Sequence, residues 1–144
     1  MAVMPIERGK LREYATATAA ARPAYLDDPK APVPPTFLAT VVFWTPIGQT
    51  LRSPEVLAAC AEAGVPADLG SLLSLEQEYV YPGPPPHAGE TLQTAERLTD
   101  ITVKRTRDGR AMVVIRFTVS FHDEVGQLRA ECHYTSAYVQ RGRP

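Results

Sequence analysis

Residues 110–122 read RAMVVIRFTVSFH, in which every second side chain is apolar. One set is apolar throughout, and its members are Val113, Ile115, Phe117, Val119 and Phe121. The intervening positions are mixed in character and end at His122. Because successive side chains of a strand point to opposite faces, this period predicts a long strand with one face in the core.

Three further strands are expected on either side of it, at residues 76–81, 91–105 and 128–139. In the last of these, alternate positions from Leu128 to Tyr138 share one face. The pair Asp108-Gly109 separates the second and third strands, and Gly126 lies between the third and fourth. Such residues favour tight turns, so long strands joined by short turns predict an antiparallel meander.

Two helices precede the strands. Residues 7–21 carry a weak apolar stripe and are followed by Arg22-Pro23, where a helix is expected to end. Residues 53–64 form a better-marked helix, with Ser53 as a cap, Pro54 at its first position and Gly64 closing it. Its body is apolar nearly all round, so we expect it to be buried against a sheet. The fold class is therefore α+β.

Composition narrows the function. The 144 residues are expected to form one domain, 1–144, whose formal net charge of −1 argues against nucleic-acid binding. No apolar run reaches the roughly 20 residues that span a membrane, and no signal peptide is evident, so we expect a cytoplasmic protein. Cys60 and Cys132 fit reduced, buried thiols. No metal-ligand spacing or phosphate-binding loop occurs, which predicts no metal and no cofactor.

Four motifs carry a family resemblance. They are RGKLREYA at 8–15, PPTF at 34–37, HAGETL at 87–92 and GQLRAECHYT at 126–135, the last continuing to Arg141. In this order and at these separations they resemble the N-terminal type of MaoC-like, FAS1-like dehydratase. Glu90 stands where that family usually has aspartate. The resemblance implies a hot-dog fold, in which an antiparallel sheet wraps around a central helix.

The chain resembles, more narrowly, the accessory subunits of heterodimeric (3R)-hydroxyacyl-ACP dehydratases. In those enzymes a MaoC-like partner carries the catalytic Asp and His in a Gly-Asp-x-Asn-Pro-x-His loop. With Pro23 aligned on the proline of that loop, Ala19 and Ala20 take the Gly-Asp positions and Arg22 and Tyr25 the Asn and His positions. The resemblance thus implies a degenerate site at Ala20 and Tyr25.

The same resemblance implies partners and a substrate. A MaoC-like catalytic subunit would complete a heterodimer or heterotetramer. The substrate would be a thioester on acyl carrier protein or CoA, from fatty-acid or polyketide synthesis. Tyr25, Pro35, Thr36 and Phe37 would line the acyl tunnel. The alternatives are that Tyr25 only packs and that residues 35–37 begin a core strand.

Catalysis by this chain would need other residues, because dehydration needs a base for the C2 proton and an acid for the leaving hydroxyl. None of the three histidines lies five residues after an Asp in a proline-containing loop; they are His87, His122 and His133. Asp28 is a candidate for a displaced acid, although Asp27-Asp28 before Pro29 is typical of a solvated turn. A tyrosine is a poor general base near neutral pH.

The sequence leaves three functions open. The chain is an accessory subunit that stabilises a catalytic partner and shapes its acyl tunnel, or a self-sufficient homodimeric dehydratase, hydratase or thioesterase. The third is a non-catalytic acyl-binding protein. Each of them predicts dimerisation, since a single hot-dog protomer leaves a sheet edge and a helix face exposed.

Overall fold

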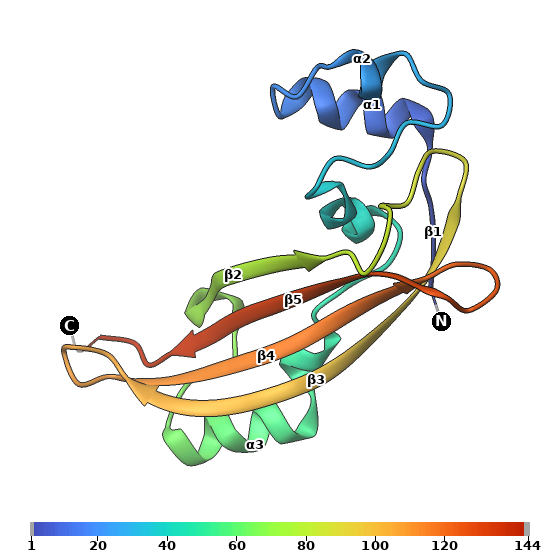
Figure 1. The fold of residues 1–144 in the computed structure, drawn as a ribbon. Coiled ribbons are helices and arrows are strands. Elements are labelled where there is room, and N and C mark those ends of the chain that lie inside the picture. The colour runs from blue at the N-terminus through green and yellow to red at the C-terminus, as the bar shows by residue number, and fades with distance from the viewer. Residues whose placement is uncertain (1, 143–144) are drawn as a thin grey trace. The chain divides into compact units, whose positions relative to one another are not determined.

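A five-stranded sheet dominates the computed structural model, which describes residues 2–142. The strands are β1 (Ala2–Pro5), β2 (Leu72–Val80), β3 (Thr91–Arg105), β4 (Ala111–His122) and β5 (Leu128–Val139). Their order in the sheet is β1-β3-β4-β5-β2, which makes β1 and β2 the edges. Neighbouring arrows point in opposite directions in Figure 1, so the sheet is antiparallel.

The helices fall into α and 3₁₀ types. The α-helices are α1 (Arg8–Ala17), α2 (Pro23–Leu26) and α3 (Pro54–Ala63), and the 3₁₀ helices are η1 (Phe37–Phe43), η2 (Gln49–Arg52) and η3 (Leu69–Ser71). The described chain divides into two compact units. The first takes residues 2–46, 79–95 and 120–132, and the second takes 47–78, 96–119 and 133–142.

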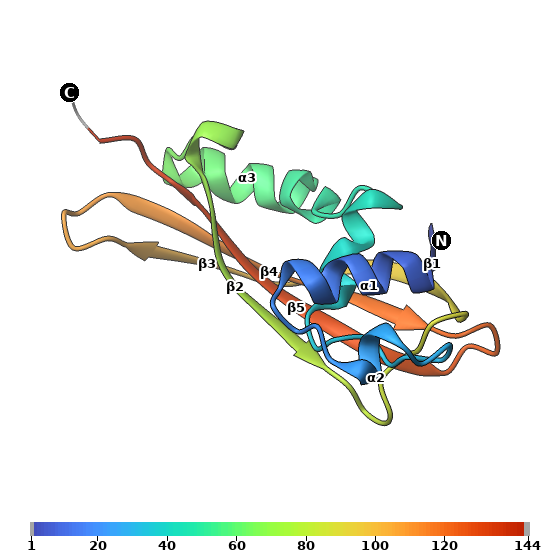
Figure 2. The same cartoon turned by 90° about the horizontal axis from the view of Figure 1, so that it is seen from above.

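In the first unit, β1 pairs antiparallel with β3 from Ala2 opposite Thr94 to Pro5 opposite Thr91. The chain then enters α1, which buries Leu11 and Ala15. α1 and α2 lie side by side in both views (Figure 1, Figure 2). The Arg8 guanidinium joins them by donating to the carbonyl of Leu26 at 3.3 Å.

In the second unit, α3 packs on the sheet through Val56 and Cys60, which meet Val113, Ile115 and Tyr138. Figure 2 shows α3 running along the strands. The predicted boundaries of this helix are confirmed. The Ser53 hydroxyl accepts a hydrogen bond from the Val56 amide, Pro54 opens the helix, and Gly64 closes it with a φ of 67°. These are the capping groups that an α-helix needs at its ends.

The burial predicted for this helix is wrong in one respect. Only Val56 and Cys60 of α3 are buried, and Leu57 is 43% exposed. The physical reason is that the sheet of one chain covers a single stripe of the helix. Ala59 and Ala63 are partly buried against the same cluster, whereas Leu57, Ala58 and Ala61 are exposed.

The alternation in β4 is confirmed, because all five apolar side chains of its predicted core face are buried. The ranges of β3 and β5 match the prediction, and β4 begins one residue later than expected. Gly109 and Gly126 turn the chain with φ of 83° and 84°. β2 begins four residues before the predicted residue 76, and β1 was not predicted, since a four-residue strand carries too little periodicity.

Two N-terminal predictions are corrected. The helix expected over 7–21 ends at Ala17, where the hydroxyls of Thr16 and Thr18 donate to the carbonyls of Arg12 and Tyr14. Pro23 does not follow the helix end directly but opens the separate helix α2. The alternative that residues 35–37 begin a strand is also wrong, because Phe37 opens η1.

Candidate functional site

The segment after α1 is the first candidate site, because the degenerate positions lie there. Ala19 has a φ of 56° and is the only non-glycine residue of the described chain with a positive φ. The Ala19 amide bonds the Thr16 carbonyl at 3.2 Å, and the Ala20 amide bonds the Ala15 carbonyl at 2.8 Å. This pair of bonds is a Schellman motif, whose left-handed position normally holds glycine. Ala19 thus has the backbone geometry of a glycine position at the end of α1.

Neither Ala20 nor Tyr25 offers acid-base chemistry in this segment. Ala20 ends in a methyl group, which exchanges no proton. Tyr25 lies in α2, is partly buried, and its hydroxyl makes no hydrogen bond within residues 2–142. Asp28 caps a turn, since its carboxylate accepts from the Lys30 amide at 2.8 Å. That contact is the turn role weighed for Asp28 from the sequence.

An apolar pocket of about 280 Å³ lies next to this segment in the same unit. Its walls come from β1, α1 and the η1 region: Pro5, Lys10, Glu13, Tyr14, Ala17, Phe37, Thr40, Phe43 and Trp44. Tyr14 and Phe37 meet edge to face, with ring centroids 5.5 Å apart. Phe43 is 78% exposed, which is unusual for a phenylalanine. The pocket suits an apolar chain and carries its only charges on Lys10 and Glu13, which pair at 3.2 Å.

Two tyrosine hydroxyls hold the PPTF segment against this pocket. The Tyr14 hydroxyl and the Thr36 hydroxyl are 2.5 Å apart, and the Tyr81 hydroxyl donates to the Pro35 carbonyl at 2.8 Å. Burial raises the pKa of Tyr81 to about 12, with smaller contributions from Cys132 and Tyr14. Tyr81 therefore remains a neutral hydrogen-bond donor at physiological pH.

Of the four predicted tunnel residues, Phe37 lies in the pocket wall and Thr36 contacts the wall residue Tyr14. Tyr25 and Pro35 are not among the residues that line this pocket. Sequence reasoning missed Tyr14 and Tyr81 as supports of the segment. The sequence did offer a signal for both. Tyr14 lies within the REYA motif, and Tyr81 directly precedes the proline-rich run before HAGETL.

His87 belongs to an ionic cluster in the first unit. Its Nε2 is 2.8 Å from a Glu90 carboxylate oxygen, and its Nδ1 is 3.0 Å from the Ala88 carbonyl. The other Glu90 oxygen accepts from Arg129 at 2.9 Å, and Arg129 also lies 3.8 Å from Asp123. Both ring nitrogens of His87 already contact oxygens, so the cluster serves to fasten the 87–90 turn to β5. Glu90 in place of aspartate leaves that turn intact, with Gly89 at a φ of 93°.

The remaining titratable candidates also have structural contacts. The Nδ1 atom of His133 is 3.0 Å from the Thr118 hydroxyl. Glu96 accepts from the Gly48 amide and from both the amide and the hydroxyl of Thr50. Cys60 and Cys132 are both buried, and burial raises the pKa of Cys60.

Between residues 2 and 142 no group of three or more His, Cys, Asp or Glu side chains is placed to hold a metal ion. No helix in this part of the chain has the length and hydropathy needed to cross a membrane.

Comparison with known families decides the classification. Residues 2–126 match the family model described as FAS1-like, dehydratase domain region. The chain belongs to this FAS1-like dehydratase family. No curated protein sequence is significantly similar to this FAS1-like dehydratase chain.

Solved structures share the fold of this FAS1-like dehydratase chain. The C-terminally truncated HadBC (3R-hydroxyacyl-ACP dehydratase) complex from Mycobacterium tuberculosis matches at a TM-score of 0.61 and 20% identity, covering 94% of this chain and 89% of that one. The ChsH1-ChsH2 complex from Mycobacterium tuberculosis matches at 0.69 and 18%, covering 96% and 85%. A MaoC-like dehydratase from Rhodospirillum rubrum matches at 0.60 and 13%, covering 98% and 89%. These likenesses confirm the hot-dog fold.

Proposed function

We propose that this chain is the accessory subunit of a heteromeric (3R)-hydroxyacyl-thioester dehydratase. A MaoC-like partner would supply the base that takes the C2 proton and the acid that protonates the leaving C3 hydroxyl. Water then departs and a 2-enoyl thioester remains. This chain would stabilise the partner and shape the acyl tunnel, so the complex acts on acyl groups carried by acyl carrier protein or CoA.

The observation that carries the proposal is a glycine-like backbone followed by an inert side chain. Ala19 has a left-handed backbone, and in the alignment on Pro23 the aspartate position falls on Ala20, which has no proton to exchange. The other candidates support it, since the His87 ring contacts the Glu90 carboxylate and Asp28 caps a turn. The acid and base are therefore assigned to another chain.

Exposed apolar surface supports the need for a partner. β2 is an edge strand of the sheet, and Leu73 and Leu75 on it are 49% and 48% exposed. An edge strand with apolar side chains tends to pair with another chain. Two of the structures that share the fold are complexes, HadBC and ChsH1-ChsH2. A MaoC-like hot-dog subunit is the partner that fits both points.

The pocket between α1 and η1 supplies the substrate side of the proposal. Its wall is apolar and aromatic, and Phe37 and Phe43 contribute rings to it. An acyl chain is the ligand that such a wall accommodates, because each buried methylene contributes about 0.8 kcal/mol. The pocket contains no side chain in the arrangement of a catalytic acid and base.

The test is an assay of crotonyl thioester hydration, the reverse reaction, with the purified chain alone and after co-expression with a MaoC-like protein that has the Gly-Asp-x-Asn-Pro-x-His loop. We expect no turnover by the lone chain and a stable, active complex with the partner. Turnover by the lone chain that is abolished in His87→Ala or Asp28→Ala would contradict the proposal and support a self-sufficient enzyme.

A further inference from the structure

The edge strand β2 is open on both of its faces as well as along its outer side. Residues 73–78 of this strand read LSLEQE and are all exposed. Because successive side chains of a strand point to opposite faces, such a run of exposed residues means that neither face is covered there. In the described chain the sheet places β5 on one side of β2 and no strand on the other. This segment can therefore accept a strand from another chain.

Glu76 and Glu78 give this open edge a negative charge. Glu76 is the middle residue of the nine that form β2. Neither carboxylate forms an ion pair within residues 2–142. Leu73 and Leu75 add exposed apolar area, but that area would stabilise the pairing with any strand that covers it. The two carboxylates are therefore the feature of β2 that can discriminate between partners.

A second copy of this chain is a poor partner for β2. Two identical antiparallel strands related by a two-fold axis place one residue opposite its own copy. When the whole strand is paired, that residue is the central Glu76, so two carboxylates meet. In the symmetric register centred on Gln77, Glu76 lies opposite Glu78, and in the one centred on Leu75 the carboxylates face Ser74 and Leu72. Like charges that lie directly opposite each other destabilise a strand pair, and none of these registers supplies a cation.

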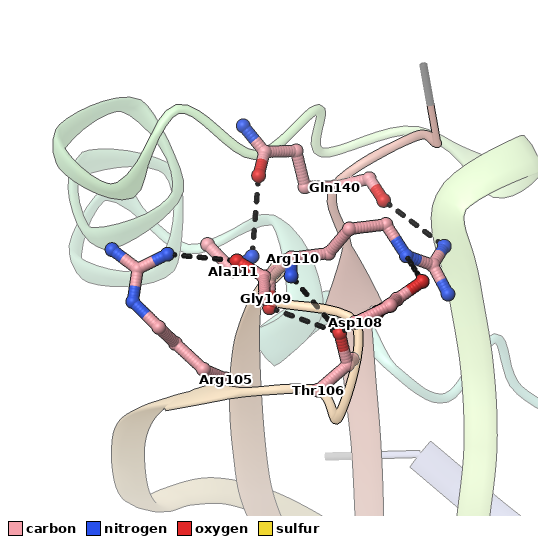
Figure 3. A network of polar contacts seen from close by, with 7 residues as sticks. All are labelled: Arg105, Thr106, Asp108, Gly109, Arg110, Ala111 and Gln140. Carbon is pink, nitrogen blue, oxygen red and sulfur yellow. Dashed lines mark hydrogen bonds and ion pairs between the residues drawn. The ribbon is translucent and has the colours of Figure 1, made fainter. Parts of the chain in front are cut away.

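No edge strand of the described chain offers β2 a basic side chain. β1, the opposite edge of the sheet, reads AVMP and carries no charge. The cations are concentrated at residues 104–110, KRTRDGR, which form the turn between the interior strands β3 and β4. Figure 3 shows this turn closed by its own contacts, with the Arg110 guanidinium bonded to Asp108 and to the Gln140 carbonyl. A second copy therefore has cations but no edge strand that carries them.

We propose that β2 selects its partner by charge and pairs with an edge strand of a different protein that carries lysine or arginine opposite Glu76 and Glu78. The identity of that protein as the catalytic subunit rests on the proposed function, whereas the exclusion of a second copy does not. The carboxylates form cross-strand ion pairs with the basic strand and repel a second copy of β2. The chain thus assembles into a heteromer rather than a homodimer.

The test uses the full chain with Glu76→Lys/Glu78→Lys as the probe for a basic edge strand. Sedimentation velocity measures the association of the wild type alone, of the lysine variant alone, and of a mixture in which the wild type is fluorescently labelled. Like charges meet in both self-pairs, so we expect the mixture to associate about tenfold more tightly than either protein alone. Added salt should reduce this difference, because it screens the ion pairs.

A neutral variant, Glu76→Gln/Glu78→Gln, tests the repulsion directly. It keeps the shape of both side chains and should self-associate about tenfold more tightly than the wild type at low ionic strength. Glu7→Gln/Glu124→Gln is the matched control, since it removes the same charge from exposed positions outside β2. The control should associate no more tightly than the wild type. Thermal melting followed by circular dichroism confirms that each variant is folded.

Two results would overturn the proposal. One is a wild-type chain that dimerises as tightly as the glutamine variant, because β2 would then tolerate a second copy. The other is a mixture of wild type and lysine variant that associates no more tightly than its components. Both are measured without a catalytic subunit and without turnover. Failure of the chain to bind a MaoC-like protein would therefore refute the proposed function and leave the charge selectivity of β2 standing.

Discussion

Ala19 holds a backbone conformation that usually belongs to glycine. An L-residue with a Cβ is strained at a φ of 56°, where glycine is not. α3 ends in the same kind of motif but places Gly64 at its left-handed position, with a φ of 67°. Ala19 therefore occupies a helix-end position whose backbone conformation favours glycine.

Replacing that residue should stabilise the protein. We expect Ala19→Gly to raise the free energy of unfolding by roughly 0.5–1 kcal/mol, since relief of strain exceeds the added flexibility of the unfolded chain. Chemical denaturation with urea measures it. Ala20→Gly is the control and should destabilise, because Ala20 has no positive φ to relieve. Destabilisation by both substitutions would count against the left-handed geometry of Ala19.

Tyr81 should make stability depend on alkaline pH. Its pKa is raised from 10.0 to about 12, so between these values the folded protein keeps a proton that the unfolded chain has lost. The stabilisation is complete below pH 10 and declines as the pH rises toward 12. We expect Tyr81→Phe to lose about 1 kcal/mol at neutral pH and to show a smaller alkaline decline.

Urea denaturation at neutral and alkaline pH checks this, with Tyr25→Phe as the control. The Tyr25 hydroxyl makes no hydrogen bond within the described chain, so its removal should change stability little. An alkaline decline in Tyr81→Phe equal to that of wild type would show that Tyr81 is not its source.

At the scale of elements, the strands were predictable and the N-terminal region was not. Apolar side chains recur at every second residue from Val113 to Phe121. This period of two does not match the 3.6-residue period of a helix, so β4 could be predicted from the sequence. Ser53 and Gly64 likewise identify the ends of α3. The alanines after Ala17 have high helix propensity, but hydroxyl bonds from Thr16 and Thr18 and the start of α2 at Pro23 end the helix earlier.

The site was predictable only in part, for a related reason. Phe37 was expected near an acyl chain and lies in the pocket wall, whereas the residues around it form a 3₁₀ helix. Local propensity favours a strand for the run from Phe37 to Trp44, but burying Phe37, Leu38 and Val41 together requires a helical turn. The role of Tyr14 depends on packing between α1 and η1, which the sequence pattern does not reveal.

The pocket between α1 and η1 predicts acyl selectivity. We expect Thr40→Phe to fill it, and to lower kcat/KM of the complex for long acyl chains relative to short ones by about fourfold for each methylene excluded. Thr40→Val is the control, since it removes the hydrogen bond to the Phe37 carbonyl without filling the pocket. Turnover of thioesters of graded length measures the effect. An unchanged length preference in Thr40→Phe would place the acyl chain elsewhere.

At the scale of the whole molecule, the prediction of one domain over residues 1–144 stays a prediction. The residues of β2, β3, β4 and β5 are divided between the two compact units. Shared strands couple the two units, so we expect one cooperative unfolding transition in scanning calorimetry. Two separated transitions would show two independent domains.

The division of labour between two chains is the central claim, and one measurement tests it most directly. The co-expressed complex is assayed for crotonyl thioester hydration in two forms, with thermal melting to confirm assembly. One form carries His87→Ala and Asp28→Ala in this chain, and the other replaces the histidine in the partner's Gly-Asp-x-Asn-Pro-x-His loop. The account predicts that turnover survives in the first form and is lost in the second. Loss in the first form with survival in the second would contradict it.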